Sequence, residues 1–343
     1  MSTIRTMLSR LGIMPRLMIG FLAISLLPCV VLLFMTTRLS TESLQKSLRD
    51  QLQAVSAAKS LELNNFIRER QGNLAILSQI ASTQTAVQQL IRARDDGDAE
   101  TVEDVNRRAR PGLVLFGETY GYDDVYLFDP AGRLLFRLKS DLDLGENLLA
   151  GPLRDSELAE VFRRCIILLQ GEVSDFQEYP GLDEPALFMA QPVLKDGVLI
   201  GVVALRVGNS EVYRGFRDYN GLGETGEAVA GMLKGREITY VSPLRHDPDD
   251  SIDRRVQEGE ARASAMQRAV RGDHGYGRMI DYRGVPAVCA WSYLPAFRWG
   301  LNVKQDEAEA FALINRQRWA VASLLGVTSL LVAAVAWSMA RSI

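Results

Sequence analysis

Gly221-Leu-Gly-Glu-Thr-Gly-Glu227 is the stretch that decides how the chain is divided. It matches the G-x-G-x-x-G pattern of dinucleotide-binding loops, which leave a strand and open a helix whose N-terminus faces the pyrophosphate. Here a polar segment, 213–220, precedes the loop, a strand-like segment, 227–233, follows it, and no Lys-Ser or Lys-Thr comes after it. This context argues against nucleotide binding and predicts a joint between two structural units.

The segments on either side of this joint repeat the same landmarks. In each half, a Gly-Arg pair that opens a strand is followed at nearly equal distances by a Pro-Ala pair and then by the glycine of an apolar strand. These landmarks begin at Gly132, Pro185 and Gly201 in the first half and at Gly235, Pro286 and Gly300 in the second. The spacing favours a duplicated unit over a chance match of common residues.

The first unit has the periodicity of an α+β fold. Two short β-rich runs, 124–129 and 133–139, are joined by Pro130-Ala-Gly132, which is a hairpin signal. A helical segment follows, and then three strands. These segments are expected at 155–169 for the helix and at 172–179, 185–193 and 198–207 for the strands. Hairpin, helix and three antiparallel strands make a PAS-like unit.

Two uncharged segments predict a membrane protein. Residues 17–37 and 319–340 contain no charged residue, and each is long enough to cross a hydrocarbon core of about 30 Å as a helix. The first resembles a cleaved signal peptide, but its apolar run is too long and no A-x-A site closes it. Residues 1–16 carry Arg5, Arg10 and Arg16 and no acid, so the positive-inside rule places them in the cytoplasm. We therefore expect a two-pass protein of the inner membrane with residues 38–318 outside the cytoplasm.

The chain leaves the first span as a long helix. Leu44, Leu48, Leu52 and Val55 recur at helical spacing, and no Pro or Gly interrupts the pattern before Gly72. The apolar face can pack against its own domain or form a seam between two subunits, and a homodimer is expected. A second helical tract, broken at 95–98, is predicted to end at Pro111-Gly112, so the helical region is 38–110.

Composition excludes several classes of function. The net charge is −3 and no basic tract occurs, so nucleic acid is not an expected partner. The three cysteines form no C-x-x-C pair, and the two histidines have no cysteine at metal-ligand spacing, so neither a metal nor a cofactor is expected. No catalytic constellation is found, and an enzyme is not predicted. Cys165 and Cys289 are either free buried thiols or a disulfide between the units.

The chain resembles the double Cache sensors, which form the extracytoplasmic part of bacterial chemoreceptors, sensor histidine kinases and membrane cyclases. The resemblance rests on the long helix, the two units, the joint motif, Phe188-Met-Ala-Gln-Pro-Val193, 197–203 and Phe297-Arg-Trp-Gly-Leu301. It implies a signal-transduction receptor with a ligand-holding unit far from the membrane and a second unit close to it. The implied divisions are a distal unit 111–219, a proximal unit 220–305, a helical link 306–318 and the start of a cytoplasmic linker at 341–343, with the output domain missing.

The sequence of the distal unit departs from that of the amino-acid-binding branch of this family. That branch carries aromatic residues after the second distal strand and an Asp in the last one, whereas here 140–157 contains no Trp or Tyr and Arg206 stands where the Asp would fall. An amino acid is therefore a less expected ligand for this chain than for the family as a whole.

Strand alternation places aromatic, small and basic side chains together in the distal unit. Two arginines interrupt apolar strands, and a guanidinium there suits a carboxylate or phosphate. The candidate ligand-binding residues are Tyr126, Phe128, Arg137, Tyr179, Phe188 and Arg206. The prediction is that this unit binds a small organic anion. The alternatives are that a helix packs on this face, that the arginines form structural ion pairs, and that the ectodomain docks a periplasmic protein or holds a dimer.

Overall fold

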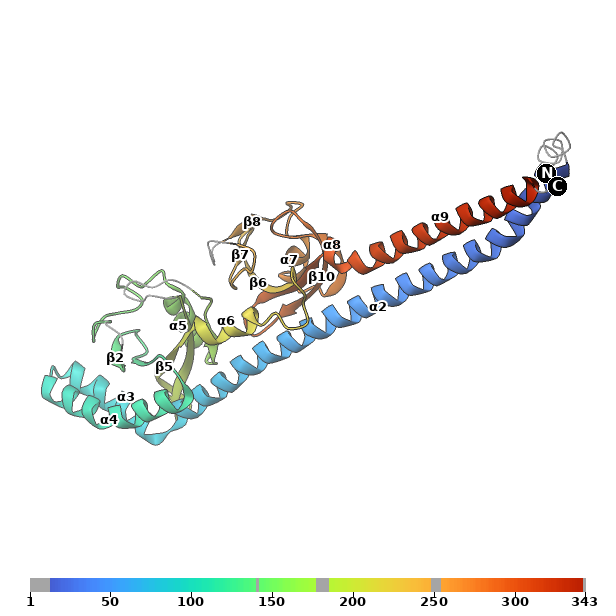
Figure 1. Ribbon diagram of the computed structural model, residues 1–343. Coiled ribbons are helices and arrows are strands. Elements are labelled where there is room, and N and C mark those ends of the chain that lie inside the picture. Colours follow the sequence, from blue (N-terminus) through green and yellow to red (C-terminus); the bar gives the residue numbers. More distant parts are fainter. Residues whose placement is uncertain (1–12, 140–141, 177–184, 248–253, 342–343) are drawn as a thin grey trace.

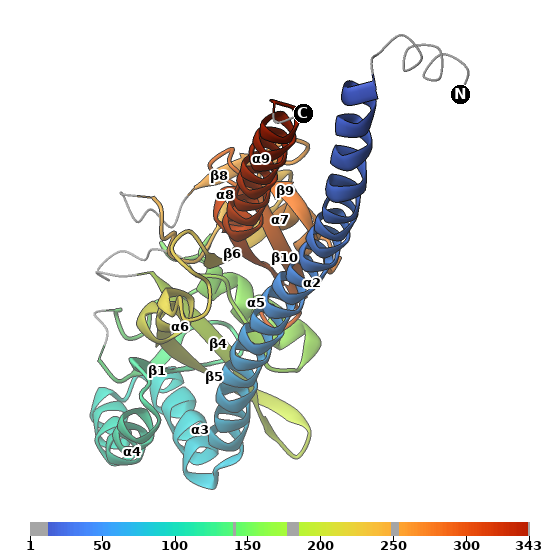
Figure 2. The same cartoon turned by 45° about the vertical axis from the view of Figure 1, so that its right-hand side comes forward.

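A computed structural model describes residues 13–139, 142–176, 185–247 and 254–341. The molecule is elongated, with helix α2, Ile13–Gln79, running along its whole length. Two α+β units lie along one side of this helix, and the first turns of α2 lie at the same end of the molecule as the end of the last helix, Ala312–Arg341 (Figure 1). Turning the molecule shows that α2 passes both units before it reaches the far tip (Figure 2).

The long amphipathic helix is present as predicted. Leu48, Leu52, Ile67 and Leu74 of α2 are buried in the same core as the residues of both sheets. The apolar face therefore packs against its own domain, which is one of the two alternatives for this helix. Burying that face supplies most of the stability of a helix that would be marginal alone.

Two further helices close the distal tip. Helix α3, Ala81–Asp95, and helix α4, Ala99–Tyr120, are separated at the predicted break, where Asp98 caps α4 by accepting from the backbone N–H of Thr101 at 3.0 Å. This cap of α4 agrees with the usual preference for Asp at a helix start.

The prediction that Pro111-Gly112 ends the helix is wrong. Pro111 lies inside α4, which continues to Tyr120 and ends at Gly121, a glycine with a φ of 71°. An interior proline costs about 3 kcal/mol because one helical hydrogen bond is lost. Leu113 and Gly117, which lie after the proline, are buried against neighbouring elements, and this packing offsets the loss.

The distal sheet is antiparallel and five-stranded, in the order β2-β1-β5-β4-β3. Helix α5, Glu157–Leu168, comes between the hairpin and the last three strands, as predicted. The strands are β1 Asp124–Phe128, β2 Leu134–Arg137, β3 Glu172–Val173, β4 Ala186–Lys195 and β5 Val198–Gly208. Helix α6, Asn209–Arg217, which the sequence did not predict, then leads to the joint.

The proximal sheet repeats this topology with one additional edge strand, in the order β8-β7-β6-β11-β10-β9. Its elements are β6 Glu227–Lys234, β7 Glu237–Tyr240, β8 Arg255–Gln257, helix α7 Ser264–Ala269, β9 Gly275–Ile280, β10 Pro286–Leu294 and β11 Trp299–Asp306. The two Gly-Arg pairs occupy the same position in their units, since Gly132 and Gly235 both lie in the turn of a hairpin and both have positive φ. The duplication predicted from spacing is confirmed by the sheet order.

The chain leaves the proximal sheet through two helices. Helix α8, Glu307–Ala310, and helix α9, Ala312–Arg341, are separated at Phe311, whose φ of −107° and ψ of 7° are not helical. The predicted continuous link is therefore interrupted. Phe311 packs under the guanidinium of Arg278, with 4.4 Å from the guanidinium carbon to the ring centroid, and this tertiary contact favours the break.

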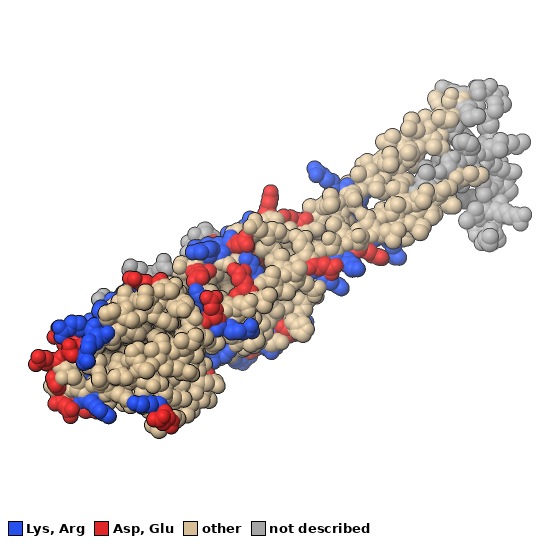
Figure 3. All heavy atoms as spheres, turned by 90° about the horizontal axis from the view of Figure 1, so that it is seen from below, with Lys and Arg blue, Asp and Glu red and all other residues tan. Residues whose placement is uncertain are grey.

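Helix α9 has the properties of a membrane span. Its segment Ala312–Val335 is long and apolar enough to cross a bilayer, and that segment is not buried in the protein. The described outer part of the paired helices at this end shows no charged side chains in this view, whereas their base and the body carry charges of both signs (Figure 3). The first predicted span, 17–37, lies within α2, but many of its side chains are outside the described set, and it stays a prediction.

Candidate functional site

Strand register brings the predicted distal side chains onto one face of the sheet. Tyr126 lies opposite both Arg137 and Ala204, and Arg206 lies opposite both Asp124 and Phe188. Directly opposed residues in antiparallel strands project to the same side. Tyr126, Phe128, Arg137, Phe188 and Arg206 therefore share the face turned away from α2.

Aromatic rings and helix α5 fill much of this face. The ring centroid of Tyr126 lies 6.2 Å from that of Phe128 and 6.0 Å from that of Phe188. Phe162 of α5 meets Phe128 edge to face, with centroids 5.6 Å apart. All four rings are buried. The alternative of a packed helix thus holds at the Phe128 end of the face, and any ligand must lie toward Arg206.

Arg206 is the least satisfied of these side chains. It is half-buried, and its Nε is enclosed without a hydrogen-bond partner. Opposite it, Oδ1 of Asp124 is occupied by the backbone, since it accepts from the N–H groups of Val125, Leu138 and Lys139 at 2.8, 2.9 and 3.0 Å. A buried donor left without an acceptor costs about 1–3 kcal/mol, so an acceptor that reached Arg206 would stabilise the fold.

Two of the predicted residues stand apart from this description. Arg137 is half-buried beside Tyr126 at the sheet edge. Tyr179 lies in 177–184, outside the described residues.

The joint loop binds a carboxylate of the chain itself. Oε1 of Glu309, in α8, accepts from the backbone N–H of Glu224 at 2.9 Å, and Oε2 accepts from the N–H of Thr225 at 2.8 Å and from its hydroxyl. A Cβ at Gly223, whose φ is 73°, would lie 2.2 Å from the same carboxylate. The glycine is required both for the turn and for this close approach.

The pKa of Glu309 reflects this contact. Burial acts to raise the pKa of Glu309, but the hydrogen bonds from Thr225 and Glu224 outweigh it and lower the pKa. Backbone N–H groups favour the charged form of a carboxyl group. The joint is therefore attached to the helix that leads into α9.

The last residue of the motif, Glu227, belongs to a buried ionic network. Nζ of Lys304 lies 2.8 Å from Oε1 of Glu227 and 2.6 Å from Oδ2 of Asp281. The hydroxyl of Tyr282 donates to Glu227 at 2.9 Å. Lys304, Glu227 and Asp281 are fully or almost fully buried, and burial alone would raise the pKa of Asp281, yet the attraction of Lys304 lowers it. The network ties β6 to β11 inside the proximal unit.

The two units meet at a contact that sequence reasoning did not identify. The indole N–H of Trp299, in β11, donates to Oδ1 of Asp175 at 3.1 Å, and Arg298 donates to the carbonyl of Val173 at 3.2 Å. Burial raises the pKa of Asp175 in spite of the Trp299 hydrogen bond. Trp299 belongs to the Phe297-Arg-Trp-Gly-Leu301 motif, which carried the family resemblance, and this contact gives that motif a structural role.

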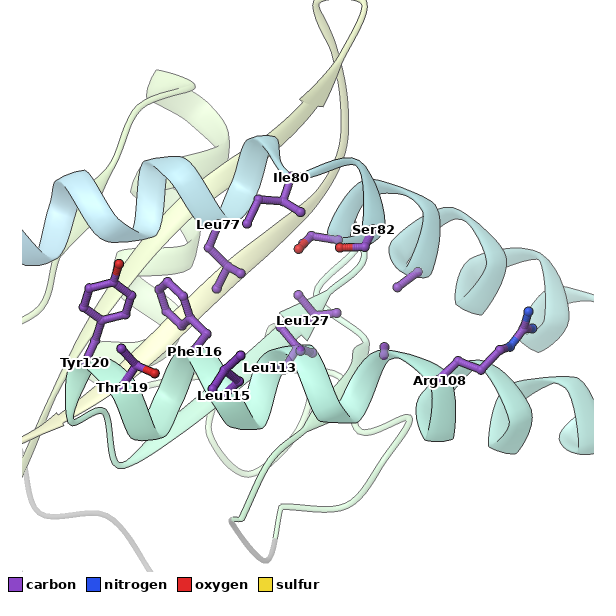
Figure 4. A pocket seen from close by; sticks show the side chains of 14 residues that line it. Leu77, Ile80, Ser82, Arg108, Leu113, Leu115, Phe116, Thr119, Tyr120 and Leu127 are labelled. Atoms are coloured by element: carbon purple, nitrogen blue, oxygen red, sulfur yellow. The ribbon is translucent and has the colours of Figure 1, made fainter.

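A separate cavity of about 400 Å³ opens at the distal tip, between the end of α2, α3 and α4. Leu77, Ile80, Leu113 and Phe116 project toward it, and Arg108 lies at one end (Figure 4). Its floor includes Leu127 of β1, on the opposite side of the sheet from Arg206. We refer to it as the tip cavity.

The two cysteines within the α/β units are free thiols. Cys165 is buried in the distal core and Cys289 in the proximal core, and burial raises the pKa of each to about 12. They are therefore unreactive at neutral pH, and the disulfide considered between the units does not form.

The fold of the chain is that of known sensor domains. No family model and no curated protein matches the sequence. Among solved structures, it is similar to the ligand-binding domain of the Campylobacter jejuni chemoreceptor Tlp3 in complex with 4-methylisoleucine, with a TM-score of 0.55 and 13% identity over 78% of this chain and 94% of that one. It is also similar to that of the Pseudomonas aeruginosa amino acid chemoreceptor PctB in complex with L-Gln, with a TM-score of 0.50 and 16% identity over 80% and 98%.

A third similar structure is the sensor domain of the V. cholerae histidine kinase DctB, with a TM-score of 0.50 and 14% identity over 77% of this chain and 98% of that one. These are domains of the double Cache type, and the chain has the double Cache fold.

Proposed function

We propose, from the double Cache fold of the chain, that it is the extracytoplasmic sensing region of a membrane receptor and binds a small organic anion in its distal unit. The ligand would lie on the sheet face that carries Tyr126, Phe188 and Arg206. Binding would be relayed through the proximal unit and α9 to a cytoplasmic output domain. The protein would be a two-pass inner-membrane homodimer.

The observation that carries the proposal is the buried Nε of Arg206 without an acceptor. A carboxylate can accept two parallel hydrogen bonds from one guanidinium, which gives both strength and orientation. Aromatic rings beside the arginine supply the apolar wall that small-molecule sites usually have. An amino acid fits less well, because the position that would hold a carboxylate for its amino group is Arg206 itself.

A physical path to the membrane supports the relay. Trp299, which contacts Asp175 of the distal unit, begins β11, and β11 leads through α8 directly into α9. The joint loop holds Glu309 in α8, so a shift between the units would move the base of α9. A chain of packed elements can couple the distal unit to the membrane helix if ligand binding and the position of α9 both depend on the same two-state movement.

The test is a thermal-shift screen of the full chain in detergent against a panel of small carboxylates. A binding carboxylate stabilises the folded state by about 2.7 kcal/mol at a hundredfold excess over its Kd. For a protein of this size, each kcal/mol raises the unfolding midpoint by about 2–4 °C. We expect Arg206→Ala to abolish that rise.

Arg108→Ala is the matched control, because Arg108 lines the tip cavity and pairs with Asp104 at 2.9 Å. It should leave the carboxylate shift unchanged. No shift with any carboxylate, or the same shift in Arg206→Ala, would refute the anion-binding proposal.

The second candidate function is docking of a periplasmic protein, and the tip cavity favours it. Exposed apolar side chains surround the cavity, with Leu115 67% and Ile80 41% exposed. Contiguous exposed apolar surface often marks an interaction site. If Leu115→Glu abolishes signalling in cells while carboxylates cause no thermal shift, docking replaces ligand sensing as the function.

A further inference from the structure

A groove of about 510 Å³ lies near the membrane, between α2 and the base of the proximal unit. Glu42, Gln45, Lys46 and Arg49 line one wall, and they share one face of α2 because they lie three and four residues apart. The opposite wall consists of Tyr276 and Arg278 of β9 and of Phe311, between α8 and α9. We refer to it as the stem groove.

The stem groove carries excess positive charge. Three of its seven lining residues are cationic and one is acidic. No described carboxylate forms an ion pair with Lys46 or Arg49, whereas Arg278 pairs with Glu307 of α8 at 3.1 Å. Aromatic rings hold two of the cations, since Arg49 lies 5.1 Å from the ring centroid of Tyr276 and Arg278 lies 4.4 Å from that of Phe311. A guanidinium held over an aromatic ring keeps N–H donors for other partners, although one nitrogen of Arg278 is already bound by Glu307.

We propose that the stem groove binds a phosphate group. A phosphate monoester carries a charge of about −1.5 to −2 and offers three acceptor oxygens, which matches three converging cations better than a planar carboxylate does. The volume is within the usual range for small-molecule sites, about 300–1,000 Å³. This site is distinct from the distal Arg206 face and does not depend on the function proposed for it.

Occupation of the groove would act on the two helices that enter the membrane. A phosphate bound by Lys46 and Arg49 draws Arg278 toward α2 and competes with Glu307 for it. Glu307 is the first residue of α8, which leads into α9. The bound phosphate thus joins α2 to β9 and releases a contact of α8, so it would change the relation between the two stem helices.

Two sources carry this chemical group, a soluble phosphorylated compound and the headgroup of an anionic phospholipid. Lys46 lies nine residues beyond Thr37, the last residue of the first predicted span, which is about 13 Å along a helix. Lipid headgroups extend about 5–8 Å beyond the hydrocarbon core. A lipid headgroup must therefore move out of the membrane surface to contact Lys46, whereas a soluble ligand can bind from solution. The experiment separates these sources.

The experiment measures thermal unfolding of the full chain in phosphatidylcholine nanodiscs. One arm adds inorganic phosphate against chloride at matched ionic strength, so that general screening is equal in both. The second arm replaces part of the phosphatidylcholine with phosphatidylglycerol and adds no phosphate. We expect a rise of about 2–4 °C or more in at least one arm. A rise in the first arm identifies a soluble ligand, and a rise in the second alone identifies a lipid headgroup.

The variant Lys46→Gln/Arg49→Gln should lose this rise, with the affinity for phosphate falling about tenfold or more. Both side chains are exposed, so the midpoint without phosphate should fall only slightly, through loss of the contact between Arg49 and the ring of Tyr276. Glu42→Gln should bind phosphate more tightly, because it removes the one carboxylate of the lining. Arg206→Ala should leave the phosphate effect intact. No rise in either arm, an undiminished rise in the double variant, or a rise lost in Arg206→Ala would overturn the proposal.

Discussion

At the scale of single residues, Asp175 shows how a partly buried carboxylate can act against stability. It lies between the two units, and burial raises its pKa in spite of the hydrogen bond from Trp299. A raised pKa means that the folded state holds the proton more tightly than the unfolded chain does. Stability contributed by this group is therefore complete below the unfolded value, about 3.9, and declines as the pH rises through the folded value.

We accordingly expect Asp175→Asn to raise the unfolding midpoint at neutral pH, because the amide still accepts from Trp299 without a charge. Each kcal/mol gained adds about 2–4 °C. The advantage should vanish below about pH 4, where the wild-type carboxyl group is protonated. Asp155→Asn is the control, since Asp155 is highly exposed. A midpoint that falls at neutral pH would mean that the charge itself holds the units together.

Removing the charge of Lys304 alone should destabilise the proximal unit. Lys304→Met leaves Glu227 and Asp281 buried near each other without their shared cation, and breaking such a network costs about 3–5 kcal/mol. Denaturant unfolding of the full chain in detergent measures the loss. Adding Glu227→Gln to Lys304→Met should recover part of the stability. Lys234→Met, which removes an exposed lysine, should change it by less than about 0.5 kcal/mol.

At the scale of elements, the joint loop and α8 form one unit through Glu309. Glu309→Gln should weaken the loop contact by about 1–3 kcal/mol, because two backbone donors lose a charged acceptor. Hydrogen exchange of the Glu224 and Thr225 amides should then accelerate roughly tenfold for each 1.4 kcal/mol lost. Glu307→Gln, in the same helix, removes the pair with Arg278 and should leave this exchange unchanged.

The loop contact also has a defined pH dependence. Because the folded-state pKa of Glu309 is lowered, its contribution is present above the unfolded value, about 4.3, and is lost as the pH falls through the folded value. Protection that persists at low pH would show that the loop is held without the carboxylate.

Gly223→Val should disturb the same contact, since its side chain would enter the space of Glu309.

At the scale of the whole molecule, the proposed topology places the body outside the cytoplasm and both termini inside. Glu103→Cys, exposed on α4, should react with a membrane-impermeant maleimide in intact spheroplasts, whereas Ser2→Cys should react only after permeabilisation. Cys165 and Cys289 are buried and should stay unlabelled in the native protein. Labelling of Ser2→Cys in intact spheroplasts would contradict the two-pass topology.

The sheets and their faces were accessible from sequence because strand periodicity is local. The alternation of Tyr126 with Phe128 and of Ala204 with Arg206 predicted which side chains share a face, and register confirms that placement. The helix end at Pro111 was predicted wrongly, because burial of Leu113 outweighed a local helix-breaking signal. The filling of the Phe128 end by α5 could be stated only as an alternative, since it depends on how a helix docks.

The sequence by itself determined the order of the distal elements from β1 to β5, the duplication, the joint at Gly221 to Glu227 and an uncharged segment near each end, because each is a pattern of neighbouring residues. Only the tertiary structure decided what the joint binds, where the units touch and that Nε of Arg206 is buried without an acceptor. Glu309 meets Thr225 across 84 residues, and Trp299 meets Asp175 across 124. Such contacts are set by the packing of two sheets on one long helix, and no local periodicity records them.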